Sequence, residues 1–358
     1  MSKNGARDNQ PAASVGVVII GRNEGKHLRR TFAALPEDKK TVVLYVDSGS
    51  TDGSVELAET MGVQVHKLDP SRPFSPARAR GEGATRLIKQ HPELACLQFV
   101  DGDCELVDGW LAAAMNHLAQ HSEVAIVCGG LQEREPERSI YNWLSARQWA
   151  LPPGMISNCG GIFMIRRSVY QNVGGFNEIL VTLEEKDLCD RVLAAGHRIV
   201  RLDTAMARHD SGLHHFSQWW QRAVWGGFGA GVQWAQGGSE SWLTLLRRYL
   251  FWPVVVPFAM VAALIGSFWA AWLIWPAVAS LAAYGVLLAR ISKSRRRLGD
   301  SWQDALIYSF MIIVRKFPVA VGFLLYLLRR GDTSGCPDPH AAQEGNRSSI
   351  KKETGSQK

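Results

Sequence analysis

No charged residue occurs between Arg248 and Arg290. A helix that crosses a bilayer needs about 20 apolar residues, so this stretch is long enough for two spans joined by a tight turn. We therefore predict a membrane helical hairpin with spans near 250–268 and 270–289, turning near Gly266. A buried hairpin in a soluble protein is the alternative, but an uncharged run of this length is typical of membrane segments.

Basic residues flank this apolar stretch. The chain of 358 residues has a formal net charge of +7 and a sequence pI of about 9.2. Much of the excess positive charge lies in Arg247, Arg248, Arg290, Lys293, Arg295, Arg296 and Arg297. In this position the charge is better explained by anionic lipid and by membrane orientation than by nucleic acid, which we exclude as a partner. The positive-inside tendency predicts a multi-pass protein of the cell (inner) membrane, with the preceding domain in the cytosol.

A third apolar segment, 304–328, contains Arg315, Lys316 and Pro318 near its middle. Charges at the centre of a bilayer are costly, so we favour an amphipathic or interfacial helix over a third span. The membrane region as a whole is predicted to cover 236–330.

The two ends of the chain, 1–14 and 331–358, are polar and are predicted to be disordered. The N-terminal end has no apolar core of a signal peptide. The 6 cysteines form no Cys-x-x-Cys pair, which disfavours zinc and thioredoxin-like chemistry and fits a reduced compartment. The sequence does not predict an oligomeric state.

The first part of the chain alternates short apolar runs with helical patterns. The runs cover 15–20, 41–46, 63–66 and 94–100 and are rich in β-branched residues. This alternation predicts an α/β fold with a mostly parallel sheet and helices on both faces. Ligands of such sheets bind at the carboxyl ends of the strands.

Polar residues follow three of these runs, and we expect them to converge on one crevice. They are Asn23 and Glu24, Asp47, and Asp101 with Asp103. Two carboxylates one residue apart at a strand end can share a divalent ion such as Mg²⁺ or Mn²⁺ together with phosphate oxygens. The alternative for Asp101-Gly102-Asp103 is a solvated turn. Asp47 can accept a hydrogen bond from a base N–H or a ribose hydroxyl.

A further acidic cluster is Glu184-Glu185-Lys186-Asp187, at the start of a predicted helix. Acidic residues in a first turn can simply complement the helix dipole. The functional alternative is a general base that takes a proton from an attacking hydroxyl.

Taken together, the motifs resemble the family 2 glycosyltransferases, which have the GT-A fold, over residues 15–235. Beyond the acidic segments, the resemblance includes Ala79-Arg80-Gly81-Glu82-Gly83, the glycine-containing segment 158–167 and Val173-Gly174-Gly175-Phe176. Processive synthases of this fold carry Gln-x-x-Arg-Trp. Here Arg222 follows Gln218 one place late and has no Trp after it, which favours a non-processive enzyme.

The resemblance implies a role for each candidate residue. Asn23, Glu24 and Asp47 would line the nucleoside pocket, and Arg80 and Arg222 would approach phosphate. Asp101 would contact ribose and the ion, and Asp103 would bind the ion directly. His209 would supply a further contact to the ion or to phosphate, and a structural role is its alternative. The implied cofactor is Mn²⁺ or Mg²⁺, which would neutralise the departing nucleoside diphosphate.

The catalytic base lies in the acidic cluster but is not settled between Glu185 and Asp187. The family commonly has Asp where this chain has Glu185, and the matching position favours Glu185. The implied reaction is a single in-line displacement that inverts the anomeric configuration.

The predicted function is transfer of a sugar from a nucleotide-diphosphate sugar to a lipid-linked or polysaccharide acceptor at the cytosolic membrane face. The alternatives are a polyprenyl-phosphate glycosyltransferase and a non-catalytic membrane assembly factor with a transferase fold. A sugar-phosphate nucleotidyltransferase would need a Gly-rich basic loop after the first strand, where this chain has Gly21-Arg22-Asn23-Glu24.

Overall fold

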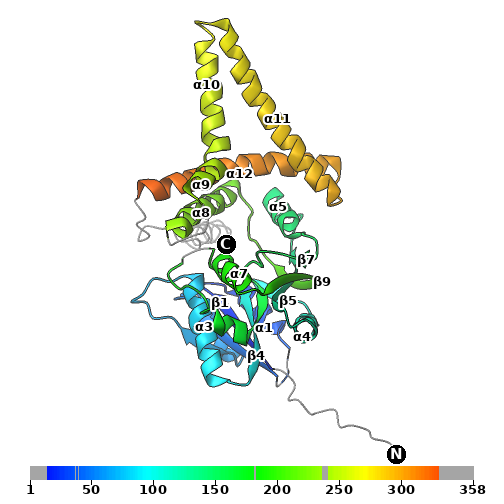
Figure 1. Cartoon of the computed structure of the whole chain (residues 1–358). Helices are drawn as coiled ribbons and strands as arrows, with labels where there is room; N and C mark the ends of the chain where they lie inside the picture. Colours follow the sequence, from blue (N-terminus) through cyan, green and yellow to red (C-terminus); the bar gives the residue numbers. More distant parts are fainter. Residues whose placement is uncertain (1–13, 37, 39, 181–182, 236–240, 330–358) are drawn as a thin grey trace, which may run out of the picture. The chain divides into compact units, whose positions relative to one another are not determined.

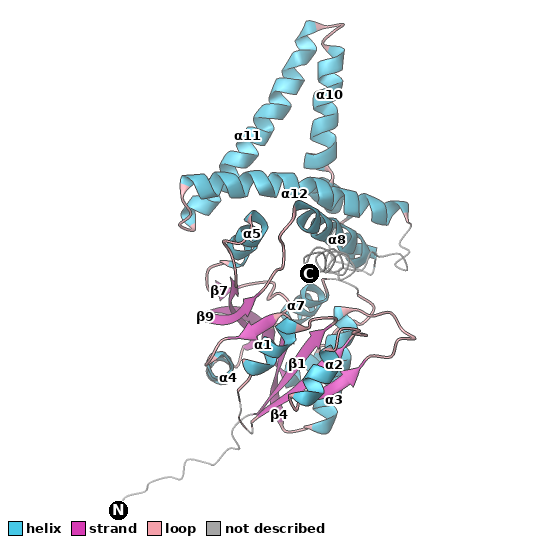
Figure 2. Cartoon of the chain, turned by 180° about the vertical axis from the view of Figure 1, so that it is seen from behind, coloured by secondary structure: helices cyan, strands magenta, loops and turns pink. Residues whose placement is uncertain are grey.

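The computed structural model describes residues 14–36, 38, 40–180, 183–235 and 241–329 (Figures 1 and 2). It divides into two compact units, Met1–Gly212 and Leu213–Lys358. The predicted disorder of the two ends falls outside the described residues, apart from Ser14.

The first unit is built on one mixed sheet with the strand order β3-β2-β1-β4-β8-β6-β9-β5, and β7 pairs with β9. The strands are β1 Ser14–Gly21, β2 Thr41–Asp47, β3 Gln64–Lys67, β4 Leu94–Asp101, β5 Cys104–Leu106, β6 Val124–Glu133, β7 Gly154–Met155, β8 Phe163–Arg166 and β9 Arg198–His209. The first four strands are parallel, as are β6 and β9. β8 is antiparallel to both β4 and β6, and β5 and β7 are antiparallel to β9.

Helices cover this sheet. They are α1 Lys26–Ala33, α2 Ser54–Thr60, α3 Pro76–Gln90, α4 Trp110–Gln120, α5 Ile140–Trp149, α6 Arg167–Asn172 and α7 Glu184–Ala194. α3 approaches the sheet closely at Gly83, where an added Cβ would lie 2.6 Å from Val18 Cγ1 and 2.8 Å from Val46 Cγ2. The predicted α/β class and GT-A-like fold are confirmed. The sheet is parallel in its N-terminal part and mixed beyond β4, because β8 runs against its neighbours.

The register of the parallel strands brings the predicted polar positions to one edge. Gly21 at the end of β1 pairs with Asp47, and Ile20 pairs with Asp101. Strand β1, between β2 and β4, is apolar and fully buried at Val17, Val18 and Ile19, as expected for a strand covered on both faces. Burial of these strands therefore fixes where the loops after β1, β2 and β4 emerge.

The second unit is helical in its described part. Its elements are α8 Phe216–Ala235, α9 Trp242–Tyr249, the π-helical turn η1 Phe251–Val255, α10 Val256–Gly266, the 3-10 turn η2 Ala271–Leu273, α11 Ile274–Arg297 and α12 Trp302–Leu328. Two described helices are long and apolar enough to cross a membrane, Ala271–Arg297 and Trp302–Leu328. A third candidate is the pair Leu243–Tyr249 and Phe251–Gly266, bent by 53°. Figure 1 shows α10 and α11 side by side as a hairpin.

Helices α8 and α12 pack with their backbones in close contact. A Cβ added at Gly227 would lie 1.9 Å from the carbonyl oxygen of Val319, and one added at Gly322 would lie 1.8 Å from that of Val224. Only glycine fits at these two positions, so the glycines fix how the two helices cross.

Candidate active site

The loops after β1 and β2 are tied together by Asn23, and the side chain of Asp47 holds the second of these loops. The Asn23 Oδ1 atom accepts a hydrogen bond from the Thr51 N–H at 2.7 Å, and the Asn23 N–H donates to Ser50 Oγ at 2.9 Å. Asn23 has φ 59°, a left-handed conformation that asparagine tolerates better than most residues. Both side chains are buried, so the two loops form one rigid rim.

Asp47 uses both of its oxygens within this rim. Its Oδ2 accepts from the backbone N–H groups of Gly49 and Ser50, each at 3.0 Å, and its Oδ1 accepts from the Tyr45 hydroxyl at 3.2 Å. Burial and the neighbouring Asp47 carboxylate raise the pKa of Tyr45 well above its usual range, so this hydroxyl remains a donor. Asp47 therefore shapes the turn, whatever contact it makes with a nucleoside.

A buried ion-pair network joins α3, β4 and α7. The guanidinium of Arg80 donates to Asp101 Oδ1 at 2.6 Å and, through its other amino group, to Glu184 Oε1. Arg80 is only 4% exposed, and Glu184 is equally buried. Burial and the adjacent Glu185 carboxylate raise the pKa of Glu184 above its usual range, while the carboxylates around Arg80 raise its pKa. Arg80 therefore joins the end of β4 to the start of α7 through its two carboxylate partners.

The loop before β8 closes over this network at a glycine. A Cβ at Gly161 would lie 2.7 Å from Arg80 Nη2 and 3.1 Å from Asp101 Oδ2. The absence of a side chain at Gly161 thus allows Arg80 and Asp101 to meet.

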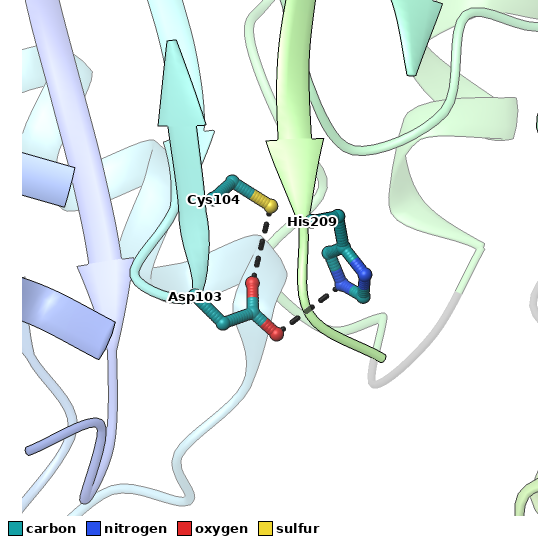
Figure 3. Close-up of side chains that lie close together, drawn as sticks. All are labelled: Asp103, Cys104 and His209. Carbon is teal, nitrogen blue, oxygen red and sulfur yellow. Dashed lines mark hydrogen bonds and ion pairs between the residues drawn. The ribbon is translucent and has the colours of Figure 1, made fainter. Parts of the chain in front are cut away.

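Asp103 lies against His209 (Figure 3). The His209 Nε2 atom is 3.2 Å from Asp103 Oδ2, and the Cys104 thiol donates to Asp103 Oδ1 at 3.2 Å. The antiparallel pairing of β5 with β9 sets Cys104 opposite His209, which explains how residues so far apart in the chain meet. Candidate ligand atoms of Asp103, Cys104 and His209 all lie within 4.8 Å of one another.

This cluster has the donor atoms for a divalent cation. A carboxylate suits Mg²⁺ or Mn²⁺, and an imidazole nitrogen suits transition metals. Burial and the neighbouring carboxylates of Asp103 and Asp101 hold the pKa of the Cys104 thiol well above its usual range. Cys104 is therefore protonated at neutral pH in the metal-free protein, and the donor atoms that best suit Mg²⁺ or Mn²⁺ are those of Asp103 and His209. Trp149 packs edge-on against the His209 ring at 4.7 Å between centroids.

The acidic residues at the start of α7 differ in their ion-pair partners. Asp187 Oδ2 accepts from Arg191 Nε at 3.1 Å and from Nη2 at 2.6 Å, one helical turn away. Within the described part of the chain, no basic side chain forms an ion pair with Glu185. The helix begins after Leu183, whose φ of 62° is left-handed and is a strained conformation of the kind found at functional sites.

Several predicted residues are thus brought together within the first unit. Asp101 joins Arg80, and Asp103 joins His209, so the two acids of Asp101-Gly102-Asp103 serve different partners. Asp101 is not a member of the Asp103, Cys104 and His209 group. Its ion-binding role stays a prediction. Arg222 lies on α8 in the second unit, so its phosphate contact also stays a prediction.

Three residues at these contacts carry no role that the sequence motifs predict. Glu184 is the partner of Arg80, and Cys104 and Trp149 surround the Asp103–His209 pair. Glu184 directly precedes the predicted base, and Cys104 directly follows Asp103. Adjacency in the sequence does not predict which way either side chain points.

Acidic residues at the strand ends thus lie beside a carboxylate–imidazole pair whose donor atoms suit a divalent ion. The fold is similar to the mannosyltransferase PcManGT from Pyrobaculum calidifontis, solved in complex with GDP-Man and Mn²⁺. The TM-score is 0.52 at 17% identity, and the match covers 87% of this chain and 86% of that one.

Residues 16–174 match the model of glycosyl transferase family 2, the family that the sequence motifs resemble. Residues 144–215 also match a model described as the N-terminal domain of galactosyltransferase. Both models describe transferases of sugars, in agreement with the resemblance predicted from the sequence.

Two curated relatives come from Mycobacterium tuberculosis. The pre-mycofactocin glycosyltransferase is 29% identical over 209 residues, which are 55% of this chain and 42% of the relative. The chain thus spans less than half the length of that relative. The N-acetylglucosaminyl-diphospho-decaprenol L-rhamnosyltransferase is 27% identical over 239 residues, which are 54% of this chain and 75% of the relative.

Proposed function

We propose that the chain is an inverting glycosyltransferase that moves one sugar from a nucleoside-diphosphate sugar to a lipid-linked acceptor at the cytosolic membrane face. The observation that carries this proposal is the pairing of Asp103 with His209 beside the Arg80–Asp101–Glu184 network at one sheet edge. Ligands of open α/β sheets bind at this edge.

In this proposal Asp103 and His209 hold a divalent ion, Mn²⁺ or Mg²⁺. The ion supplies positive charge that neutralises the nucleoside diphosphate as it leaves. The mixed oxygen and nitrogen donor set favours Mn²⁺. The rim of Asn23, Glu24 and Asp47 holds the nucleoside, with Asp47 acting mainly through the shape of the turn.

Arg80 has a different part in the reaction from the one implied by the resemblance. Both of its amino groups already bind carboxylates, so Arg80 holds Asp101 and Glu184 in place instead of reaching for the diphosphate. Asp101 keeps a second oxygen for a ribose hydroxyl or the ion. Arg222 remains the candidate for a phosphate of donor or acceptor.

Glu185 is the proposed base. Asp187 is held by Arg191, whereas no described basic side chain pairs with Glu185, so Glu185 is the carboxylate available to an acceptor hydroxyl. Glu185 takes the proton from that hydroxyl, whose oxygen forms the new bond to the anomeric carbon as the bond to the diphosphate breaks. One displacement of this kind inverts the configuration.

The lipid-linked acceptor is supported by the apolar helices of the second unit and by the decaprenol-linked acceptor named for one relative. The same membrane setting fits a polyprenyl phosphate as acceptor, which is the second candidate. The helices suit a multi-pass protein of the cell membrane, with basic residues at both ends of the hairpin on the cytosolic side.

The test uses the detergent-purified chain with Mn²⁺, radiolabelled nucleotide-sugars and two acceptors, polyprenyl phosphate and polyprenyl-diphospho-N-acetylglucosamine. Transfer to the second acceptor, with an inverted anomeric carbon in the product, supports the proposal. Transfer only to polyprenyl phosphate supports the second candidate. Absence of nucleotide release with every donor would favour a non-catalytic assembly factor.

A further inference from the structure

The exposed face of α12 forms one continuous apolar stripe. Its members, which we call the α12 stripe, are Trp302, Leu306, Phe310, Phe317, Val321, Leu324 and Leu328, and all are exposed. Half-buried Ile313 fills the gap between Phe310 and Phe317. The spacing of three or four residues places all of them on a single side of the helix over its whole length.

The charges of α12 lie off this stripe. Arg315 and Lys316 are the fourteenth and fifteenth of its 27 residues. At 100° per residue, Arg315 projects from the side opposite the stripe and Lys316 from its flank. If α12 crossed a bilayer, both charges would lie near the centre, each at a cost of about 3 kcal/mol or more.

A corner held by an ion pair sets the direction of α12 at its N-terminal end. Arg295 Nε donates to Asp300 Oδ2 at 2.6 Å, and the Arg295 guanidinium lies 4.5 Å from the centre of the Tyr308 ring. Close by, the Ser292 and Ser309 hydroxyls are 2.9 Å apart and join α11 to α12. These buried contacts turn the chain sharply between the two helices.

The C-terminal half of α12 is fixed by α8 through Gly227 and Gly322, as described above, and by α9 through Tyr249, whose ring stacks on Phe323 at 5.2 Å. With both halves held, α12 runs across the foot of the α10–α11 hairpin instead of alongside it, in both views (Figures 1 and 2). A hairpin that enters a bilayer would therefore leave α12 lying in the membrane plane.

We propose that α12 does not cross the membrane but lies in the cytosolic lipid surface, with the α12 stripe among the acyl chains. Arg290, Lys293, Arg296 and Arg297 of α11 are exposed next to the corner, where anionic headgroups would complement them. The stripe and this basic cluster together form a docking surface for an anionic lipid leaflet.

The proposal is tested by depth measurements on the full chain in vesicles of phosphatidylcholine with anionic phosphatidylglycerol. Single cysteines replace Leu306, Phe317 and Leu328 in turn, in a background with Cys336→Ser, and carry a nitroxide label. The five other cysteines are buried. Relative collisions with oxygen and with a water-soluble nickel complex report the depth of each label by electron paramagnetic resonance.

We expect the three labels to lie at one depth, about 5–10 Å below the headgroup level, although Leu306 and Leu328 are about 33 Å apart along the helix. Labels at Val278→Cys and Val286→Cys on α11 are the control, and their depths should differ by about 12 Å.

A label at Phe317 deeper than those at Leu306 and Leu328 would make α12 a span. Labels shielded from oxygen at all three positions would place a protein surface, such as a second copy, on the stripe. Either of these last two results overturns the proposal.

Discussion

Arg80 on α3 and Glu184 on α7 form a buried ion pair although 104 positions separate them in the chain. Arg80 also binds Asp101 at the end of β4. One side chain therefore links β4, which carries predicted contacts to the sugar donor, to α7, which carries the predicted base. This link makes the site one structural unit.

Arg80→Ala should destabilise the first unit by about 3–5 kcal/mol, because it leaves the buried Glu184 and the half-buried Asp101 without their cation. Unfolding in urea, followed by circular dichroism in detergent, measures the change. Arg72→Ala is the matched control: Arg72 also bridges two carboxylates but is 55% exposed, and its loss should cost less than about 1 kcal/mol. Equal losses for the two variants would mean that the Arg80 network is not buried as described.

Glu185→Gln should lower kcat by roughly 10²–10⁴-fold with little change in the KM for the donor, because the base acts on the acceptor hydroxyl. Asp187→Asn should keep most of the turnover and lose about 0.5 kcal/mol of stability, since it removes only the pair with Arg191. Initial rates of nucleotide release measure both variants. The reverse ranking would move the base to Asp187.

The free energy of unfolding should fall as the pH rises above about 4.5 in part because of Glu133. Burial raises the pKa of this carboxyl from its ordinary value of 4.5, and its Oε2 atom is buried with no hydrogen-bond partner among the described residues. The native state therefore holds a proton that the unfolded chain has lost, so stability decreases with pH until the raised pKa is passed. Glu133→Gln should flatten this decrease in metal-free protein, as measured by urea unfolding between pH 4.5 and 7. An unchanged slope would contradict the burial of Glu133.

Gly227→Ala and Gly322→Ala should each destabilise the second unit by about 1–3 kcal/mol or more, because the added methyl would overlap a backbone carbonyl that has no room to move. Gly226→Ala and Gly285→Ala meet nothing within 4 Å and should be neutral or stabilising by up to about 1 kcal/mol. Thermal unfolding in detergent micelles compares the four. Equal effects at Gly226 and Gly227 would refute the close packing of α8 on α12.

Local sequence pattern was sufficient to predict the strand ends but not their partners. The apolar runs before Asp47 and Asp101 predict buried strands, and parallel strands place their carboxyl ends together. The split between Asp101 and Asp103 depends instead on the three-residue strand β5, whose pairing with β9 decides that Asp103 faces His209. No periodicity in so short a strand predicts that register.

In the membrane region too, local sequence pattern predicts the helices but not their contacts. The absence of charge predicts the hairpin, since composition alone decides whether a helix tolerates lipid. The direction of α12 depends on contacts that form only in the folded unit, the Arg295–Asp300 pair and the two glycines that meet α8. Arg315, Lys316 and Pro318 near its middle were the sequence signals that favoured an interfacial helix over a span.

In the proposed function, Asp103 and His209 hold the ion that binds the donor diphosphate. Calorimetric titration of Mn²⁺ into the detergent-purified chain, with GDP or UDP present, tests it against Asp103→Asn and His209→Ala, with Cys104→Ala as the control. We predict that both test variants lose at least about tenfold in Mn²⁺ affinity while the control keeps it. Wild-type affinity in Asp103→Asn would contradict the account.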